Sequence, residues 1–492
     1  MRKEVKLLII VIVVILVIGI AIFAFSSNSN ATYTADKEIT TNEQLSGGVY
    51  GSASPDKNSI LVNGKIKDEL SGLKVNKTGD SAMSEQSSFY GMNSAILAKG
   101  GAELIINNIE VLTNANGANG IFCYGGSNGE APNSTNQSAN GGGQPDGGSQ
   151  PPEATGNGGG QPDGGSQPPE ASGNGGGQQG GGSPNNQGSL DSDGTKIIVK
   201  DSSITTTEDQ SGGIMVAGGG LLDASNLKIK TNGQSSAAIR SDRGGGNMTV
   251  DGGTYETTGR GSPAIYSTAM ILVKNAELIS SASEGVIIEG KNSIDLEKVT
   301  LTDTNNELHG KSTSYKNIFI YQSMSGDADV GQADFKATDS KITTNQGDTI
   351  YVTNTNAKIY LKNNEFVNND DSGNFLRIQK DSWGTNGSNG GNVSLTLDNQ
   401  KVNGPISVDS ISSLNMTLGN NSNFEGVFKE ISGNTINLHL DKTSKIKLTG
   451  DSYVSSLDDE VSDYSNIDFN GFKLYVNGKA INWFLTFFFF YF

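Results

Sequence analysis

A six-residue pattern recurs along the chain: an apolar residue, any residue, then Asn, Asp or Gly, any two residues, and a second apolar residue. Asn, Asp and Gly tolerate the left-handed backbone of a sharp turn better than most residues do. The pattern therefore predicts two strands joined by a corner, with both apolar side chains facing inward. The nine corner positions are Asn108, Asp201, Asn226, Gly252, Asn275, Lys298, Asp339, Asn363 and Asn399, and Lys298 is the one departure from the pattern.

These corners are regularly spaced. From Ile204 to Leu301 the second apolar residue advances in steps of 25, 26, 23 and 23 residues, and the next step, to Ile342, is 41. A period in the low twenties made of short strands is typical of a β-solenoid, and we interpret the long step as a coil that carries an outward loop. Strict alternation in residues 359–361 and 393–397 is also typical of strands. We expect an all-β, parallel β-helix of about 10–12 coils over residues 58–480.

Two residues after each second apolar residue stands a small polar residue. We interpret this column as a stack that satisfies turns inside the solenoid. An exposed hydroxyl face for ice or sugar is less consistent with the sequence, because Lys230, Glu256 and Ile279 interrupt its regularity. The column comprises Thr113, Thr206, Thr231, Thr257, Ser280, Asp303, Thr344 and Asn368.

The N-terminus carries a localisation signal. Arg2, Lys3 and Lys6 are followed by uncharged apolar residues from 7 to 25. A segment of this length is typical of a transmembrane helix, and the basic flank favours a cytoplasmic N-terminus. We expect residues 1–25 to form a signal anchor, residues 26–57 a polar tether and the β-helix to lie outside the cell membrane. Cleavage near Ala31, with secretion, is the alternative.

Two further segments depart from the repeat. Residues 125–194 are rich in Gly, Gln, Pro and Ser and contain a tandem repeat that begins at Asn140 and again at Asn157. Such a composition cannot build a core, so we expect a disordered insertion within one domain. Residues 481–492 are aromatic and too short to span a membrane. Our hypothesis for this tail is a reading frame that continues past its proper stop, and the functional alternative is a segment that adheres to the membrane surface.

Charge and cysteine content exclude several classes of function. The formal net charge is −17 and the pI is near 4.6, which argues against a nucleic-acid partner because phosphates demand clustered Lys and Arg. The single cysteine, Cys123, forms no internal disulfide and is expected to be a small buried residue. One Cys and two His do not supply a zinc cluster.

Parallel β-helices often carry enzymes that act on polysaccharides, so the sequence could hold catalytic residues. Asp370 and Asp371, together with Arg377 and His309-Gly310, resemble polygalacturonase motifs. The His-Gly pair precedes the acidic pair, however, which reverses that family's order, and its Arg-Ile-Lys is here Arg-Ile-Gln. Further acidic candidates for a hydrolase are Asp327 with Asp329, and Asp458, Asp459, Glu460 and Asp463.

A lyase would use a basic residue beside acidic calcium ligands. The best constellation is Arg240 and Arg243 flanking Asp242, with Asp223 and Asp251 one coil away, and we interpret it as salt-bridged surface charge. Asp-rich turns leave calcium as the one candidate cofactor, although the nonapeptide of calcium-binding β-rolls is missing. No catalytic, metal or cofactor residue is assigned.

Aromatic side chains could stack on sugar rings if they are exposed. The candidates are Tyr266, Tyr321, Tyr351, Tyr360 and Trp383.

Four stretches, at residues 237–246, 261–267, 321–328 and 448–453, resemble a family of bacterial adhesin-like surface proteins. The resemblance covers roughly residues 195–478. It implies a right-handed parallel β-helix of pectate-lyase-like architecture and an extracellular, cell-associated protein, and it implies no catalytic residue.

These observations support three hypotheses of function. The first is a membrane-anchored surface protein that contacts a host or cell-wall glycan, or a surface protein, through the exposed faces of its coils. The second is a polysaccharide lyase or glycoside hydrolase on the same fold. The third is a passive surface spacer without a ligand.

Overall fold

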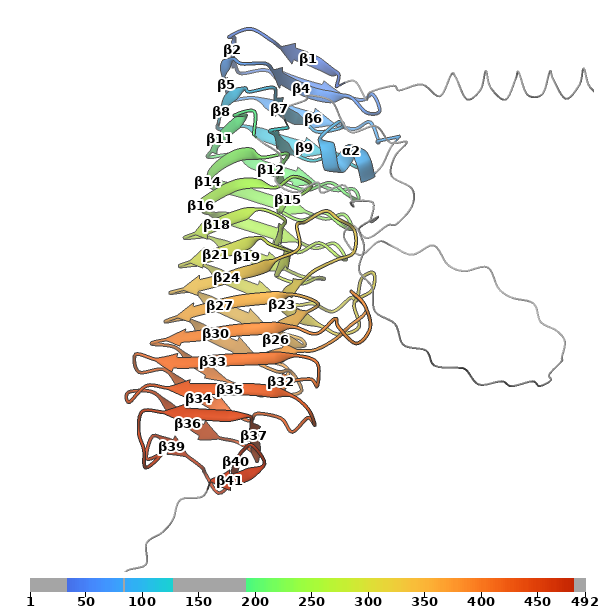
Figure 1. Ribbon diagram of the computed structural model, residues 1–492. Coiled ribbons are helices and arrows are strands. Elements are labelled where there is room, and N and C mark those ends of the chain that lie inside the picture. The colour runs from blue at the N-terminus through green and yellow to red at the C-terminus, as the bar shows by residue number, and fades with distance from the viewer. Residues whose placement is uncertain (1–32, 83–84, 127–191, 482–492) are drawn as a thin grey trace, which may run out of the picture.

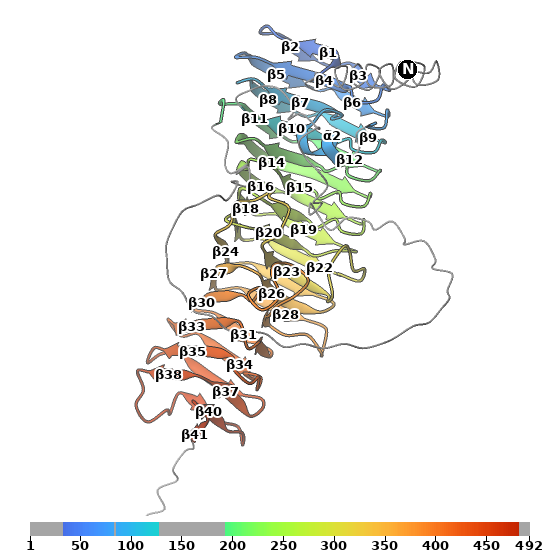
Figure 2. The same ribbon diagram turned by 45° about the vertical axis from the view of Figure 1, so that its right-hand side comes forward.

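The computed structural model describes residues 33–82, 85–126 and 192–481. Its strands stack into one rod, with the N-terminal coils at one end and the C-terminal coils at the other (Figures 1 and 2). These described residues are all-β apart from one short helix, α2 (Glu85–Tyr90). The predicted transmembrane helix, the insertion between 127 and 191 and the aromatic tail from 482 onward lie outside the described residues. Among the residues described, no helix has the length and apolarity needed to cross a membrane.

The rod has three faces, each a ladder of parallel strands, and one coil contributes a strand to each. The first face consists of β1 (Ala35–Ile39), β4 (Asn58–Asn63), β7 (Ile96–Lys99), β10 (Ile121–Tyr124), β13 (Ile214–Ala217), β15 (Ile239–Ser241), β17 (Ile265–Ser267), β20 (Val286–Glu289), β23 (Lys316–Tyr321), β26 (Asp348–Thr353), β29 (Leu376–Ile378) and β32 (Ile406–Val408).

The second face contains β2 (Gln44–Ser46), β5 (Lys67–Ser71), β8 (Glu103–Asn107), β11 (Lys196–Lys200), β14 (Gly220–Thr231), β16 (Gly246–Thr257), β18 (Met270–Lys274), β21 (Ser293–Glu297), β24 (Gln332–Thr338), β27 (Asn356–Lys362), β30 (Asn392–Asp398), β33 (Ser413–Gly419), β35 (Thr435–Leu440) and β38 (Ser456–Asp459). Within the described residues this ladder therefore has fourteen strands, more than the 10–12 coils expected from the corner pattern.

The third face begins with β3 (Val49–Ser52), β6 (Lys74–Lys77), β9 (Glu110–Thr113) and β12 (Ser203–Thr206), and β14 and β16 run through the corner to join it. It continues with β19 (Glu277–Ser280), β22 (Thr300–Asp303), β25 (Lys341–Thr344), β28 (Glu365–Asn368), β31 (Lys401–Asn403), β34 (Asn423–Gly426), β36 (Lys445–Leu448) and β39 (Ile467–Asp468). At the C-terminal end β37 (Ser452–Val454) pairs with β40 (Leu474–Val476), which pairs in antiparallel with β41 (Lys479–Ile481).

All nine predicted corners have the left-handed backbone. Their φ values lie between 47° and 75°, and Lys298 shares this conformation at 56°. Some corners are also joined by their side chains. Asn226 Nδ2 donates to Asp201 Oδ1 at 2.6 Å and Asn363 Nδ2 donates to Asp339 Oδ1 at 2.6 Å. The corner residues thus fix both the turn within a coil and the register between coils.

The predicted tether is wrong from Ala35 onward. Residues 35–52 form β1, β2 and β3, which pair in parallel with β4, β5 and β6. The corner pattern is present here too, with Gly47 between Leu45 and Tyr50 and with φ 70°. The solenoid therefore begins one coil earlier than residue 58.

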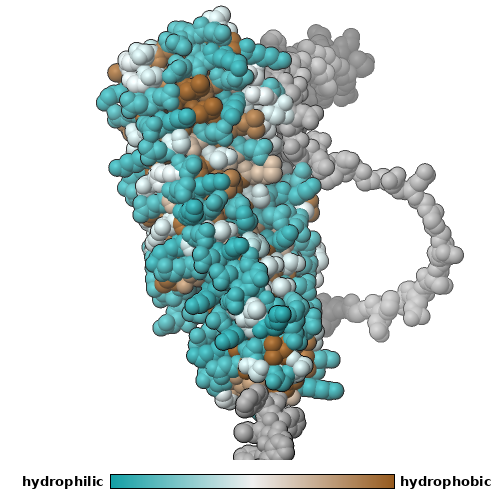
Figure 3. All heavy atoms as spheres, turned by 90° about the vertical axis from the view of Figure 1, so that its left-hand side faces the viewer, coloured by the Kyte–Doolittle hydropathy of each residue, from teal (hydrophilic) through white to brown (hydrophobic). Residues whose placement is uncertain are grey.

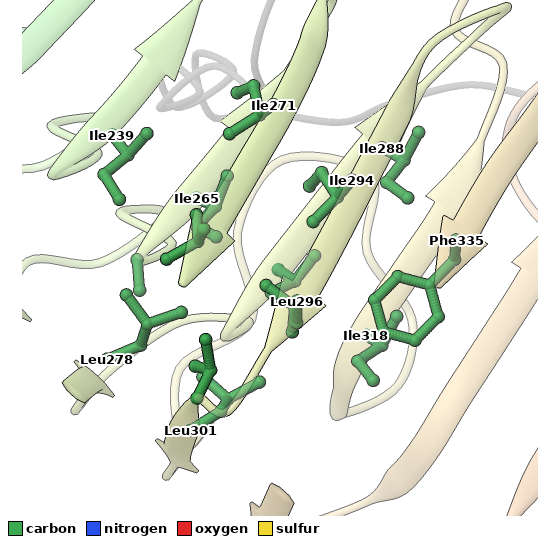
Figure 4. Close-up of a cluster of buried hydrophobic side chains, with 14 of the residues drawn as sticks. Ile239, Ile265, Ile271, Leu278, Ile288, Ile294, Leu296, Leu301, Ile318 and Phe335 are labelled. Atoms are coloured by element: carbon green, nitrogen blue, oxygen red, sulfur yellow. The ribbon is translucent and has the colours of Figure 1, made fainter. Parts of the chain in front are cut away.

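The core is the continuous interior between the three faces. Figure 4 shows how alternate side chains of face one, such as Ile265 and Ile288, meet Ile271 and Ile294 of the second face and Leu278 of the third. Each of these side chains is at most 3 % exposed. At roughly 1.5–3 kcal/mol per fully buried large apolar side chain, this interior supplies the main stabilisation of the rod without a disulfide.

The polar column is internal except for the half-buried Asn368, and several of its members satisfy turns as predicted. Thr206 and Thr231 donate their hydroxyls to the carbonyls of Ser211 and Ser236 in the next turn of the same coil. Ser280 does the same to Ser283 at 2.9 Å. Since these side chains are buried, the column offers no outer surface to ice or sugar.

Cys123 is fully buried in the core, as expected, and burial raises the pKa of its thiol to about 12. It lies just before the point where the insertion leaves the solenoid. Gly126 and Ser192 form an antiparallel bridge there, so the chain departs from and returns to one place. The long step before Ile342 is likewise explained by residues 304–315 and 322–331, which flank β23.

Replacing Lys298 by Asn should stabilise the rod. Lys pays the full steric penalty of a positive φ, whereas Asn tolerates it, so the free energy of unfolding should rise by about 0.5–1 kcal/mol. Chemical unfolding of the full chain measures this difference. The matched control is Lys228→Asn, an exposed lysine within a strand, where no gain is expected. Equal or lower stability of Lys298→Asn would contradict the role assigned to the corners.

Candidate functional site

The outer side of the first face is covered. Leu97, Phe122 and Met215 point away from the main core and pack against Phe89 and Tyr90 of α2. Farther along the rod the same side of the face carries a second apolar cluster, which comprises Ala237, Tyr266, Ile287, Phe319, Tyr321, Tyr351 and Trp383. The strands of this face from β4 to β26 are therefore buried on both sides, unlike those of the second and third faces.

The pair expected as surface charge lies beneath this cover. Arg240 Nη2 is 2.9 Å from Asp242 Oδ2, and the two side chains are only 2 % and 4 % exposed. Arg240 Nη1 also donates to Ser88 Oγ of α2 at 3.1 Å. The prediction of a salt bridge is confirmed. The prediction that it lies on the surface is wrong, because α2, which comes from a distant part of the sequence, covers the pair.

The two acids placed nearby by the sequence lie elsewhere. Asp223 belongs to β14 on the second face, where it forms an ion pair with Lys196 at 2.7 Å, and Asp251 is exposed on β16. Their place is taken by Asp327, whose Oδ1 is 2.9 Å from Arg243 Nε. Arg243 also lies over the Phe89 ring at 4.4 Å, so this pair fastens residues 322–331 to α2.

A third carboxyl group, Glu289 at the end of β20, is fully buried beside them. Tyr266 and Tyr321 donate their hydroxyls to Oε2, the latter at 3.0 Å. Ser323 donates to Oε1, and Ser325 does so at 3.4 Å. Burial, reinforced by the negative charge of Asp327, raises the pKa of Glu289 to about 7. Sequence reasoning missed Glu289 because nothing in residues 286–289 distinguishes it from an ordinary strand end.

Asp242, Glu289 and Asp327 thus share one buried neighbourhood with two arginines. Burial, followed by repulsion from Asp242, raises the pKa of Asp327 as well. Carboxyl groups in unlike environments are the parts that glycosidases use as acid and base. Here their oxygens are bound by Tyr and Arg side chains of the first face and by Ser side chains of residues 322–331, and the arrangement holds that segment in place.

The residues that resemble polygalacturonase motifs do not form one site. His309 is buried against Ser235, with Nε2 3.5 Å from Oγ, and burial and Arg260 lower its pKa to about 4. Asp370 caps a turn, where its Oδ2 accepts from the Gly347 amide at 2.8 Å. Arg377 pairs with Asp348 at 2.6 Å. Within the described part of the chain, no hydrogen bond or ion pair joins His309, Asp370 and Arg377.

The remaining acidic candidates are scattered too. Asp458 lies at the C-terminal end of the second face and is 2.8 Å from His439 Nδ1. Asp459 accepts from Asn466 Nδ2 at 3.0 Å, and Asp463 caps its own turn by accepting from the Ser465 amide at 3.1 Å. These contacts are those of structural turns. Over the described ranges no group of three or more His, Cys, Asp or Glu side chains is placed to hold a metal ion.

Four of the five aromatic candidates for sugar stacking are wrong. Tyr266, Tyr321, Tyr351 and Trp383 are buried in the apolar cluster of the first face. Tyr360 is half-buried on β27 and donates its hydroxyl to Asp398. Apolar-looking strands of the first face are covered on both sides, and the sequence pattern of a strand does not show what lies over it.

An open groove of about 610 Å³ lies on the third face, near the C-terminal end of the rod. It runs over β31, β34, β36 and β39, whose alternate residues point outward while Phe424 and Ile446 fill the core. Its outward-facing side chains are Lys401, Asn403, Asn423, Glu425, Lys445, Lys447 and Asp468. Sequence reasoning did not single out this groove.

The groove follows the stacking direction of the coils. Lys401, Asn423 and Lys445 occupy one row of the ladder. Asn403, Glu425, Lys447 and Asp468 occupy the next row. Neighbouring rungs are about 4.8 Å apart, so each row presents polar groups at regular steps along the axis. This regularity suits contact with a linear polymer.

A smaller hollow of about 490 Å³ lies at the corner of coils near the N-terminal end. Four of its polar side chains are already paired with one another, since Asn226 binds Asp201 at 2.6 Å and Lys74 binds Glu110 at 2.9 Å. We therefore take the groove on the third face as the candidate site.

The side of the rod shown in Figure 3 is predominantly hydrophilic, with only separate apolar spots.

Replacing Glu289 by Gln should remove a pH dependence of stability. Because folding raises the pKa of this carboxyl from about 4.5 to about 7, its stabilising contribution is present below pH 4.5 and is lost as pH rises through 7. As the pH rises from 4.5 to 8, the free energy of unfolding of the wild type should therefore decrease by at most about 3 kcal/mol relative to that of Glu289→Gln.

Unfolding free energies at pH 5 and pH 8 for both proteins check this difference. Glu277→Gln, at an exposed position of β19, is the matched control and should follow the wild type. Parallel pH profiles for wild type and Glu289→Gln would show that the buried carboxyl is not held neutral by the fold.

No family model, no curated protein sequence and no solved structure matches this chain.

Proposed function

We propose that this protein is a membrane-anchored surface protein that binds carbohydrate through the groove on its third face. The single observation that carries the proposal is the groove itself: about 610 Å³ of open space over four successive strands, lined by amide and charged side chains. Amide and ammonium groups are hydrogen-bonding partners for sugar hydroxyls, and the repeated rungs bring such groups to successive sugars of a chain.

The fold favours binding over catalysis. Asp242 and Asp327 are each tied to an arginine, and Glu289 accepts from four hydroxyl groups under the cover of the first face. In the groove, Glu425 is paired with Lys447 at 2.7 Å. The open site therefore lacks the pair of free carboxyl groups on which glycoside hydrolysis depends.

The proposal includes the architecture and the location. The coils belong to a right-handed, pectate-lyase-like β-helix of the adhesin-like kind, since right-handed crossovers dominate parallel β-structures. The apolar residues from 7 to 25 anchor the chain with a cytoplasmic N-terminus, and the β-helix lies outside the cell. Secretion after cleavage near Ala31 would leave the groove unchanged.

A polysaccharide lyase or hydrolase is the second candidate. The buried neighbourhood of Asp242, Glu289 and Asp327 favours it, because three carboxyl groups converge there beside two arginines. Catalysis would require residues 322–331 to leave Glu289. Incubation with uronate polymers distinguishes the two functions: release of unsaturated or reducing ends that is lost in Asp242→Asn would establish the enzyme, and intact polymers support binding alone.

Substitution in the groove should weaken carbohydrate binding. Asn403→Ala and Asn423→Ala each remove an exposed amide, and the loss of one or two hydrogen bonds corresponds to roughly a tenfold weaker affinity. Titration of the purified full chain with oligosaccharides that score on a glycan array measures the change.

Asn247→Ala is the control, since Asn247 is exposed on the second face, away from the groove. Equal affinity in the groove variants and the wild type would place the binding surface elsewhere. Absence of binding to host and wall glycans alike would leave the passive spacer as the function.

A further inference from the structure

The charges of the groove are unequally compensated. Lys447 binds Glu425 at 2.7 Å, and this hydrogen bond, together with Coulombic attraction to Glu425 and Asp468, raises the pKa of Lys447. Lys401 and Lys445, in the neighbouring row, form no ion pair with any described residue. The nearest acid along their row is Glu365 of the preceding coil, which is held by Lys341 at 2.7 Å.

These two lysines are separated by one coil. The register places Asn423 of β34 between Lys401 of β31 and Lys445 of β36. Two rungs correspond to about 9–10 Å along the axis. A sugar in an extended chain advances by nearly the length of one rung. Three consecutive sugars along this row would therefore face an ammonium group, a neutral amide and a second ammonium group.

The charge of the whole chain limits which polymer can bind. The net charge of −17 repels polyanions, and the two lysines offset this repulsion only near themselves, since salt screens both effects over a Debye length of about 10 Å. A densely charged polymer meets this repulsion with every sugar and gains only two close contacts. A polymer with an acidic group on every second sugar meets less repulsion and satisfies both lysines.

We propose that the groove selects a linear acidic polysaccharide in which charged and neutral sugars alternate, with its acidic groups on Lys401 and Lys445 and its neutral sugar on Asn423. This selectivity rests on the proposed carbohydrate binding of the groove. Sugar carboxylates and sulfates share the chemistry that the two ammonium groups recognise, and both occur in alternating polymers.

Three probes of equal length test the proposal on the full chain: an alternating glucuronate–N-acetylglucosamine octasaccharide, a neutral N-acetylglucosamine oligomer and an oligogalacturonate. A sulfated alternating octasaccharide distinguishes sulfate from carboxylate. The alternating carboxylate probe should bind tightest by calorimetry, ahead of both the neutral and the fully charged chains. The affinity for this probe should decrease when the salt concentration is raised from 0.1 to 0.5 M.

Lys401→Gln and Lys445→Gln should each weaken the alternating probe about fivefold, as expected for one partly exposed charge contact, and leave the neutral probe unchanged. Lys200→Gln is the matched control, because Lys200 is an exposed lysine at the end of β11 on the second face. The lysines are on the surface, so circular dichroism should be unaltered in all three variants.

The outcomes separate this inference from the function on which it rests. Equal binding of neutral and alternating probes, or lysine variants without effect, would overturn the selectivity while carbohydrate binding stands. Tightest binding of the oligogalacturonate would overturn the alternation. Failure of all probes, with array-wide silence, would remove the proposed function together with the selectivity.

Discussion

The left-handed corner between the second and third faces is the constraint on which the structure depends. At each corner a residue with positive φ bends the chain from the second face onto the third, so the apolar residues on both sides of the corner face inward. Because the turn has the same geometry in every coil, strands of one coil fall into register with those of the next. A continuous core follows, and with it two long exposed faces whose side chains repeat at the strand spacing.

Much of this architecture could be predicted because the corner has a local chemical signature. Asn, Asp and Gly at fixed distances from apolar residues report the turn directly, and every predicted corner was found. Gly47 carries the same signature, which places the first coil within the residues expected to form a tether. The direction of side chains within a strand could also be predicted, since alternation separates the inward Phe424 from the outward Asn423 and Glu425.

The chemistry beyond the coils could not be predicted in this way. Arg240 is buried because Ser88 and Phe89 of α2 lie over it, and α2 follows no repeat in the sequence. Likewise the Tyr266 and Tyr321 side chains point outward from their strands as sugar-stacking residues would, yet the residues around Trp383 cover them. What lies over a face is set by loops of irregular composition, and the period of the strands carries no information about them.

The two polar regions of the molecule therefore differ in kind. Under the cover, acids and bases are bound to one another and to α2, and they consolidate the first face. On the third face the rows that include Lys401 and Lys445 remain open to a partner. Together these features describe a rod of stacked coils with a polar groove near its C-terminal end.

The most direct test of this account is a crystal structure of the protein with an alternating acidic octasaccharide. The account predicts density for a sugar chain that runs along the rod axis across β31, β34 and β36, with acidic groups beside Lys401 and Lys445. Density over the first face, with residues 322–331 displaced from Glu289, would contradict it and would make the buried carboxyl cluster the functional site.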